Sequence, residues 1–195
     1  LAGRIWNVQS IAENKGTVYV SQLFQGGDVP FVGERGIDVS EEICRKMKDI
    51  YMSDSVYPYL DMRTHTAEKL FSARECFRQK GLMKSNFTSD GICYTWAGEI
   101  INWTICLLAK YYLDKNVENT YLSLSGLSID EMKYIVSQNR PEPYFLSSLI
   151  KNRRYKEQEK YDKYLPIRLL DKEYGTRNLN VEGAWRTVKD IIENS

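Results

Sequence analysis

The stretch that decides the fold is residues 91–127, GICYTWAGEIINWTICLLAKYYLDKNVENTYLSLSGL. Large apolar side chains alternate with smaller ones from Ile92 to Trp96, which is the period of two typical of a strand. Gly98 interrupts this pattern and permits a sharp turn. From residue 100 to 113 apolar side chains lie almost all round a helix, and a helix that is apolar on most faces is buried. It is too short to span a membrane, which needs about 20 apolar residues.

A second apolar run, from Tyr121 to Leu127, follows this helix and predicts another strand. Asp114 and Asn116 separate the two elements and end the helix. Two strands joined by a helix imply a parallel pair with a right-handed crossover. We therefore expect a central βαβ unit to form the core.

The residues before this unit predict a small sheet followed by helices. Residues 4–8 and 17–20 read as two strands of a hairpin, because β-branched and aromatic residues favour strands. The loop 25–36 carries four glycines but has no GxxxxGK pattern, so it is not an ATP-binding P-loop. Its glycines either allow positive φ angles in a folded loop or contact a phosphate.

Several helices are predicted around the central unit. Ser40 caps the first, with acidic residues in its first turn, where the helix dipole favours them. A second helix, from Asp61 to Gly81, places Arg74 on a face shared with Ala67, Leu70, Phe71 and Phe77. The Arg74 stem either lies along the edge of the core, as long basic side chains do, or points inward towards a phosphate. Further helices are expected over 129–136, 144–150, 167–174 and from Val181 onward.

The fold class predicted is α+β, with an N-terminal β-hairpin, a central βαβ unit and a helical C-terminal part. We expect one domain over residues 1–195, with possible sub-parts at 1–38, 39–140 and 141–195. The chain begins with Leu1, and its first residues already look like a strand, so we expect it to be a piece of a longer protein.

Composition excludes several classes of site. The formal net charge is +1, which argues neither for nor against a nucleic-acid partner. The four cysteines form no CxxC pair and His65 is the one histidine, so the ligand spacing of a zinc site is absent. Each cysteine lies in an apolar pattern and is expected in the core, which suggests a reducing cytoplasm. His65 has no obvious partner for acid–base catalysis.

Residues 151–163, KNRRYKEQEKYDK, form the densest run of charge. The pairs Arg153–Glu157 and Glu159–Lys163 have opposite signs four residues apart, which is typical of a solvated helix face. Basic residues nevertheless gather at the start of the run, at positions 151, 153, 154 and 156. On its residues alone the chain reads as a binding or scaffolding domain.

Four segments together resemble the region that follows the motor domains in large DEAD/DEAH-box helicases of the Lhr-like group. The first is GRIWNVQSI with YVSQLFQGGDVPFVGERG, and the second is YPYLDMRTHTAEKLFSARECFRQKGL. The third is ICYTWAGEIINWTICLLAKY, and the fourth is KYDKYLPIRLLDKEYGTRNLNVEGAW. The segments keep their order and cover nearly the whole chain.

The resemblance implies a non-catalytic C-terminal accessory domain of an ATP-dependent superfamily 2 helicase. ATP and Mg²⁺ would bind to motor domains upstream of Leu1, with no cofactor in this chain. Such a domain holds single-stranded DNA or RNA with Lys/Arg for the backbone and aromatic platforms for the bases, or braces the motor. Tryptophans in strands, such as Trp6 and Trp96, are more often part of a core. The candidates for nucleic-acid contacts are Arg4, Trp6, Arg35, Arg63, Arg74, Trp96, Lys151, Arg153 and Arg154.

Two other functions stay open on the sequence. The chain has 14 Tyr and 4 Trp, and these residue types are frequent hot spots of protein–protein interfaces. A small stand-alone enzyme would use the glycine-rich loop 25–36 together with Arg63 and His65.

Overall fold

The computed structural model describes residues 6–12, 17–22, 38–60, 65–159 and 162–194. The chain divides into two compact units, residues 1–37 and 38–195, and each is described by itself. The described residues form seven α-helices, a two-stranded sheet and a three-stranded sheet, which confirms the predicted α+β class.

The first unit contains the predicted hairpin. Strand β1 (Trp6–Ala12) pairs antiparallel with β2 (Thr17–Gln22), and the register shifts between Val8 and Ser10. Alternating β-branched residues favour this pairing.

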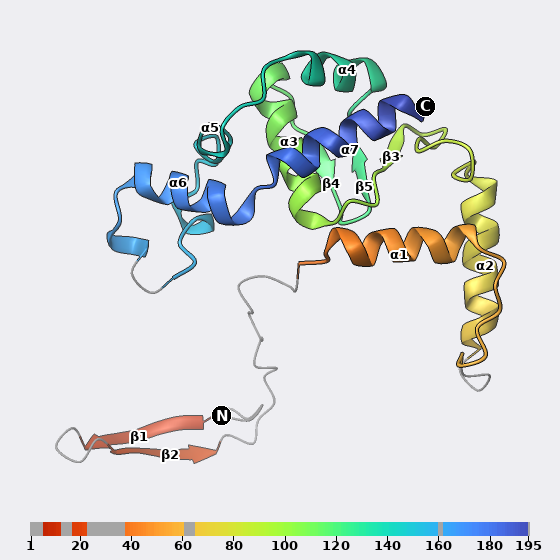
Figure 1. Ribbon diagram of the computed structural model, residues 1–195. Coiled ribbons are helices and arrows are strands. Elements are labelled where there is room, and N and C mark those ends of the chain that lie inside the picture. Colours follow the sequence, from red (N-terminus) through yellow and green to blue (C-terminus); the bar gives the residue numbers. More distant parts are fainter. Residues whose placement is uncertain (1–5, 13–16, 23–37, 61–64, 160–161, 195) are drawn as a thin grey trace. The chain divides into compact units, whose positions relative to one another are not determined.

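The central sheet of the second unit has the order β3-β5-β4 and is antiparallel throughout. Its strands are β3 (Ile92–Tyr94), β4 (Glu118–Asn119) and β5 (Ser123–Ser125). The predicted parallel pair of neighbouring strands is therefore wrong. The crossover from β3 does lead to a strand parallel to it, β4, but β5 returns between the two (Figure 1).

A tight turn at Thr120 explains this difference. The Thr120 Oγ1 accepts hydrogen bonds from the backbone N–H groups of Leu122 and Ser123, at 3.1 and 3.0 Å. Residues 120–122 thus belong to a turn, although Tyr121 and Leu122 read as the start of a strand in the sequence. Thr side chains favour such turns because they hydrogen-bond to the backbone a few residues on.

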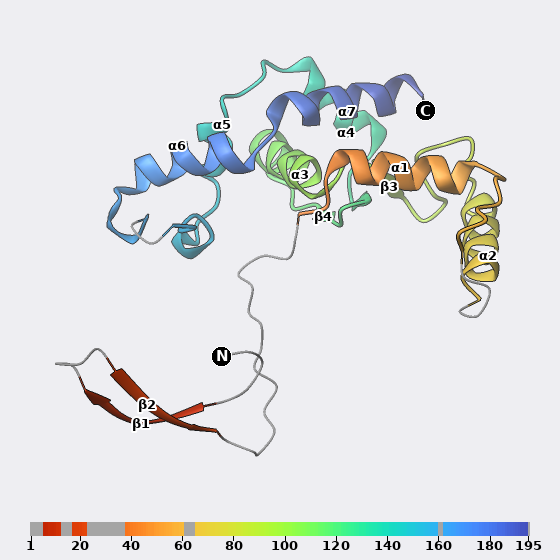
Figure 2. The same ribbon diagram turned by 60° about the horizontal axis from the view of Figure 1, so that its bottom comes forward.

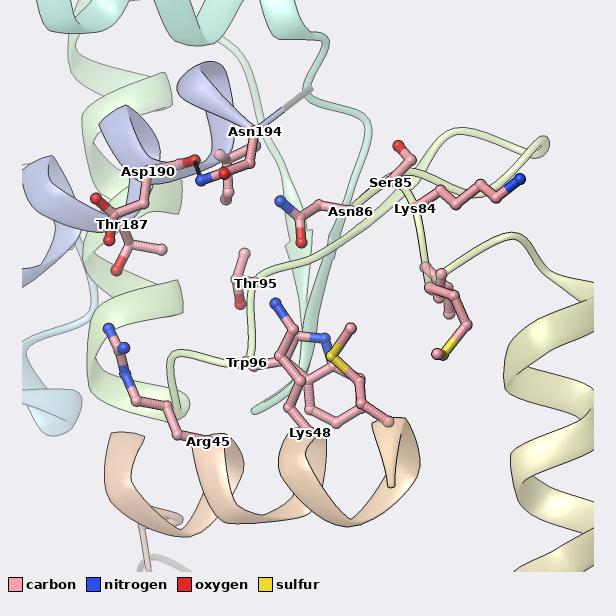
Figure 3. A pocket seen from close by; sticks show the side chains of 14 residues that line it. Arg45, Lys48, Lys84, Ser85, Asn86, Thr95, Trp96, Thr187, Asp190 and Asn194 are labelled. Carbon is pink, nitrogen blue, oxygen red and sulfur yellow. Dashed lines mark hydrogen bonds between the residues drawn. The ribbon is translucent and has the colours of Figure 1, made fainter. Parts of the chain in front are cut away.

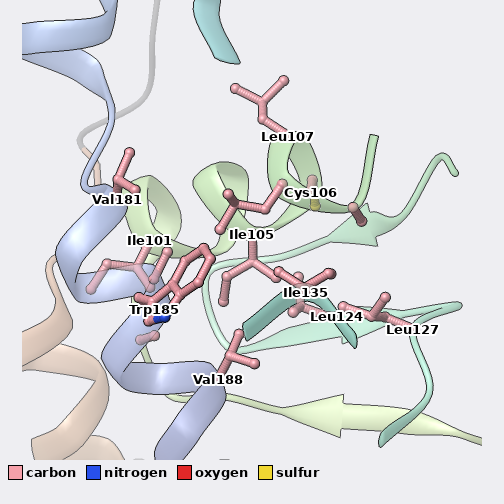
Figure 4. Packing of buried hydrophobic residues seen from close by; sticks show 14 of the residues in the cluster. Ile101, Ile105, Cys106, Leu107, Leu124, Leu127, Ile135, Val181, Trp185 and Val188 are labelled. Atoms are coloured by element: carbon pink, nitrogen blue, oxygen red, sulfur yellow. The ribbon is translucent and has the colours of Figure 1, made fainter. Parts of the chain in front are cut away.

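Helix α3 (Glu99–Leu113) forms the centre of the core, as its apolar sequence predicts. Helix α7 (Val181–Glu193) crosses α3 and lies next to α4 (Ile129–Ser137) (Figure 1 and Figure 2). Ile105 and Leu108 of α3 are fully buried. Figure 4 shows residues from these three helices and β5 meeting in one cluster.

A second, smaller cluster joins α1 (Glu41–Met52) and α2 (Thr66–Gln79) to the β3–α3 turn. Ser40 caps α1 as predicted, because its side chain accepts a hydrogen bond from the N–H of Ile43. The cluster consists of Cys44, Phe77, Leu82 and Trp96, with partly buried residues around them.

Two predictions for α2 are wrong. Phe71 was expected on the buried face but is 63% exposed, and the Cys76 thiol is exposed as well. Arg74 and Phe77, three residues apart, form the inward face of α2, and residue 76 is rotated by about 100° from Phe77 and further still from Arg74. The other three cysteines are buried as expected, and burial raises the pKa of Cys93 and Cys106 to about 12.

The C-terminal part contains α5 (Pro143–Ser147), α6 (Ile167–Asn178) and two short 3₁₀ turns, η3 (Arg153–Tyr155) and η4 (Asp162–Tyr164). The helix expected over the charge run 151–163 is thus not continuous. Its start is a single turn capped by the Asn152 side chain, which accepts from the N–H of Arg154 at 3.1 Å.

Candidate nucleic-acid interface

The charge of the second unit is concentrated in residues 151–178, which comprise η3, η4 and α6 and are called the basic lobe here. This segment carries nine Lys/Arg and five Asp/Glu, whereas the whole chain has a net charge of only +1. What such a surplus does depends on which of these charges are already paired.

Three of the five acidic residues are engaged inside the lobe. Asp171 forms a buried ion pair with Lys156, whose side chain is 2% exposed. Asp162 is buried and accepts hydrogen bonds from the N–H groups of residues 158 and 159, both at 2.8 Å. Glu157 accepts from Arg153 Nε at 2.6 Å, which is the predicted pair four residues apart.

The remaining two acids converge on one cation. Arg177 lies 3.2 Å from the Glu173 carboxylate and 3.7 Å from that of Glu159. Glu159 was expected to pair with Lys163, and its recorded ion-pair partner is Arg177 instead. Every acidic side chain of the lobe therefore has a partner within the lobe.

Arg153, one of the predicted nucleic-acid contacts, is used to build the lobe. Its Nη2 donates to the carbonyl oxygens of Asp162, Lys163 and Leu165, at 3.2, 3.1 and 2.7 Å. These bonds hold η4 and the start of α6 against η3. The guanidinium therefore positions other residues of the lobe, although its side chain is 40% exposed.

Among the described cations of the lobe, five are exposed and form no ion pair with any described carboxylate. Arg168 and Lys172 are four residues apart on α6 and therefore lie on the same helix face. The five residues are Lys151, Arg154, Lys163, Arg168 and Lys172.

Aromatic and apolar side chains lie among these cations. Tyr155 and Tyr164 are 62% and 73% exposed, and the Lys163 Nζ lies 5.0 Å from the centre of the Tyr164 ring. Leu169 lines a shallow hollow of about 450 Å³ beside α6, together with Lys172. The lobe thus combines unpaired positive charge with exposed ring faces.

Two predicted contacts, Arg74 and Trp96, are buried instead of exposed. Arg74 is 6% exposed and donates from Nε and Nη1 to the carbonyl oxygens of Ile50 and Ser55, at 3.0 and 3.1 Å. It joins α2 to the segment after α1, so its role is structural. Trp96 is 4% exposed because three aromatic rings surround it at centroid distances of 5.7–5.9 Å.

Arg4, Arg35, Arg63 and the loop 25–36 lie outside the described residues, and Trp6 lies in β1.

His65 is exposed and pairs with Glu68 through Nδ1 at 3.0 Å. Neither side chain lines a cavity among the described residues, so the contact is a surface hydrogen bond at the start of α2.

The sequence reasoning missed Lys163, Arg168, Lys172 and Tyr164. Residues 151–163 already carry six Lys/Arg and three Asp/Glu, and extending the window to residue 178 adds the cations Arg168, Lys172 and Arg177 together with two acids. Which of them are unpaired depends on the tertiary contacts.

Comparison with protein families, with curated proteins and with solved structures finds no match to this chain. In the described parts, no group of three or more His, Cys, Asp or Glu residues could hold a metal ion. None of the described helices is long and apolar enough to cross a membrane.

Proposed function

We propose that this chain is a non-catalytic accessory domain of an ATP-dependent helicase, and that the basic lobe holds single-stranded DNA or RNA. The observation that supports it best is the asymmetry of pairing in the lobe. All five acids are engaged internally, while five of the described cations are exposed without an ion-pair partner. The order of the four helicase-like segments supports the same proposal.

In the proposed complex the cations neutralise backbone phosphates, which supplies affinity without sequence preference. Tyr155 and Tyr164 offer ring faces on which bases stack, and stacking contributes about 1–3 kcal/mol per base. The buried Lys156–Asp171 pair and Arg153 keep the lobe in shape while the strand is bound.

The test is a fluorescence-anisotropy titration of labelled single-stranded DNA and RNA at several salt concentrations. For single strands, log Kobs falls with log[salt] by about 0.7 per neutralised phosphate. If Arg168 and Lys172 each contact one phosphate, the double variant Arg168→Ala/Lys172→Ala has a slope that is shallower by about 1.4.

The matched control removes two lysines outside the lobe, Lys46 and Lys133, which pair with Asp49 and Asp130. This control variant should keep the wild-type slope. The proposed interface is overturned if the Arg168→Ala/Lys172→Ala variant and the control variant show the same slope of log Kobs against log[salt]. It is also overturned if the wild type does not bind at low salt.

A second candidate function, docking of another protein, is favoured by the exposed aliphatic residues of α6. Ile167 and Leu169 are 44% and 53% exposed, next to the hollow beside α6. In this case the lobe braces the motor domains that the resemblance predicts upstream of Leu1. Leu169→Ser would then weaken binding of separately added motor domains about tenfold in calorimetry and leave nucleic-acid binding unchanged.

A further inference from the structure

A second cavity lies away from the basic lobe, between α1, the last turns of α7 and the segment 82–86 (Figure 3). Its volume is about 380 Å³, within the range of roughly 300–1,000 Å³ typical of small-molecule sites. It is called the α1–α7 cleft below. Nothing in the sequence marked it, because its walls come from three separate segments, α1, residues 82–96 and α7.

Positive charge dominates the walls of the cleft. Arg45, Lys48 and Lys84 line it, and among the described lining residues Asp190 is the one carboxylate. Figure 3 shows Arg45 and Lys48 rising from α1 into the cleft, with Arg45 directed towards Thr187 and Asp190 of α7. Lys84 points outward at the opposite rim.

The two lysines are not neutralised by a described carboxylate. Arg45 pairs with Glu41 at 2.7 Å, but Lys48 and Lys84 form no ion pair among the residues that the structure describes. Lys48 is half-buried on the wall of the cleft. A cleft lined mainly by one sign of charge, with a lysine that has no carboxylate partner, favours an anionic ligand.

Thr187 gives an independent sign of a missing partner. Its side chain is 5% exposed and lines the cleft, and its Oγ1 has no hydrogen-bond partner among the described residues. Buried hydroxyl groups are nearly always hydrogen-bonded in native structures. A ligand atom in the cleft would supply the bond.

The rest of the lining suits a partly flat, partly polar molecule. Asn86 and Asn194 present carboxamides, while Met52 and Met83 are adaptable apolar residues. Trp96 lines the cleft at φ +55°, a conformation rare for a bulky residue, and the surrounding rings hold it there.

We infer that the α1–α7 cleft binds a phosphorylated ligand of mononucleotide size. Lys48 holds the phosphate, Arg45 adds positive charge beside it while it stays paired with Glu41, the Thr187 hydroxyl donates to one of the phosphate oxygens, and the carboxamides meet the polar edge of the base. The same chemistry is offered by a free nucleotide and by the 5′-phosphorylated end of a strand. The inference does not rest on the proposed function of the basic lobe.

The experiment is isothermal titration calorimetry of the full chain with AMP, CMP, inorganic phosphate and adenosine. We expect saturable 1:1 binding of at least one mononucleotide with a Kd of about 1 mM or tighter. Adenosine should bind at least about tenfold more weakly, because it lacks the charged group.

Lys48→Gln should weaken mononucleotide binding about tenfold. Lys46→Gln, on the same helix but absent from the cleft, should not. Thr187→Val should weaken binding several-fold while the melting temperature stays equal or rises, because the variant removes an unpaired buried hydroxyl. A structural role for Thr187 would lower the melting temperature instead.

A further titration distinguishes a free nucleotide from a strand end as the ligand. It compares a 5′-phosphorylated oligonucleotide with its unphosphorylated form, using the Arg168→Ala/Lys172→Ala variant. A Lys48-dependent preference for the phosphorylated strand, without mononucleotide binding, assigns the cleft to strand ends. No Lys48-dependent binding of any of these probes overturns the inference. If inorganic phosphate binds and neither AMP nor CMP does, the inference that the ligand has the size of a mononucleotide is overturned.

Discussion

Gly98 is the position where one added methyl group should do most damage. It precedes α3 at φ +84° and ψ 173°, and the start of α1 passes directly against it. A Cβ at this position would lie 2.6 Å from the Val39 carbonyl oxygen and 2.8 Å from the Glu41 nitrogen. Both are backbone atoms, so no side-chain rotation can relieve the overlap.

The cost of Gly98→Ala has three parts. This φ/ψ region is essentially restricted to glycine, and occupying it costs about 1–3 kcal/mol. Forcing the two helix starts apart costs about 1–3 kcal/mol, as overpacking usually does. The hydrogen bond from the Glu99 N–H to the Val39 carbonyl, 3.1 Å long, is worth about 0.5–1.5 kcal/mol and would be strained or lost. The sum is about 5 kcal/mol, a large share of a typical stability of about 5–15 kcal/mol.

The assay is thermal and urea unfolding followed by circular dichroism. For a unit of this size, 1 kcal/mol corresponds to about 2–4 °C, so Gly98→Ala should lower the melting temperature by roughly 10–20 °C. Gly91→Ala is the matched control, because Gly91 has a similar φ of +80° and no atom within 4 Å of an added Cβ. It should cost only the conformational part, about 1–2 kcal/mol.

Equal destabilisation by Gly98→Ala and Gly91→Ala would refute this reasoning. The close approach of α1 to α3 would then contribute nothing to the stability of the unit, and the backbone angle alone would account for both effects.

Three further predictions concern buried and titrating groups. Lys156→Met should destabilise the chain by about 3–5 kcal/mol in urea unfolding because it leaves Asp171 buried and unpaired. Adding Asp171→Leu to this variant should recover most of the lost stability. If the destabilisations of the two single variants simply add in the double variant, the prediction is contradicted. In native protein at pH 8, Cys76 should react fastest with a thiol reagent because its thiol is exposed. Burial raises the pKa of Cys93 to about 12, so Cys93 should react only after unfolding. Rapid reaction of the native Cys76→Ser variant with the reagent would contradict this prediction. The hydrogen bond and charge of Lys115 lower the pKa of Glu131 from its ordinary value of 4.5. The ionised Glu131 therefore contributes its full stability above pH 4.5, and this contribution is lost as the pH falls through the lowered pKa. Glu131→Gln should remove this part of the acid dependence in unfolding experiments between about pH 6 and 3.

Local patterns predicted much of the secondary structure. The buried α3, the Ser40 cap and the N-terminal hairpin all follow from periodicity and capping residues close together in the chain. The helix from Ile129 follows in the same way, because Ser128 and Glu131 form a capping box. These features depend on interactions within a few residues, which a single sequence exposes directly.

Strand direction and the exposure of single side chains were harder to predict. The run from Tyr121 to Leu127 is apolar enough to be one strand. Its first two residues instead belong to the turn at Thr120, which reverses the chain between β4 and β5. On α2, Phe71 has the spacing of a core residue and yet is exposed, because no described residue covers it. Periodicity cannot show where a neighbouring element ends.

By itself, the sequence determined where the main helices and the hairpin form, and that the segment after residue 150 is rich in basic residues. Only the tertiary structure decided which of those charges are free. Arg153 is bound to three carbonyl groups and Lys156 to a buried carboxylate, whereas Arg168 and Lys172 remain exposed. The physical reason is that pairing depends on distances between segments brought together by packing, and the same holds for the α1–α7 cleft.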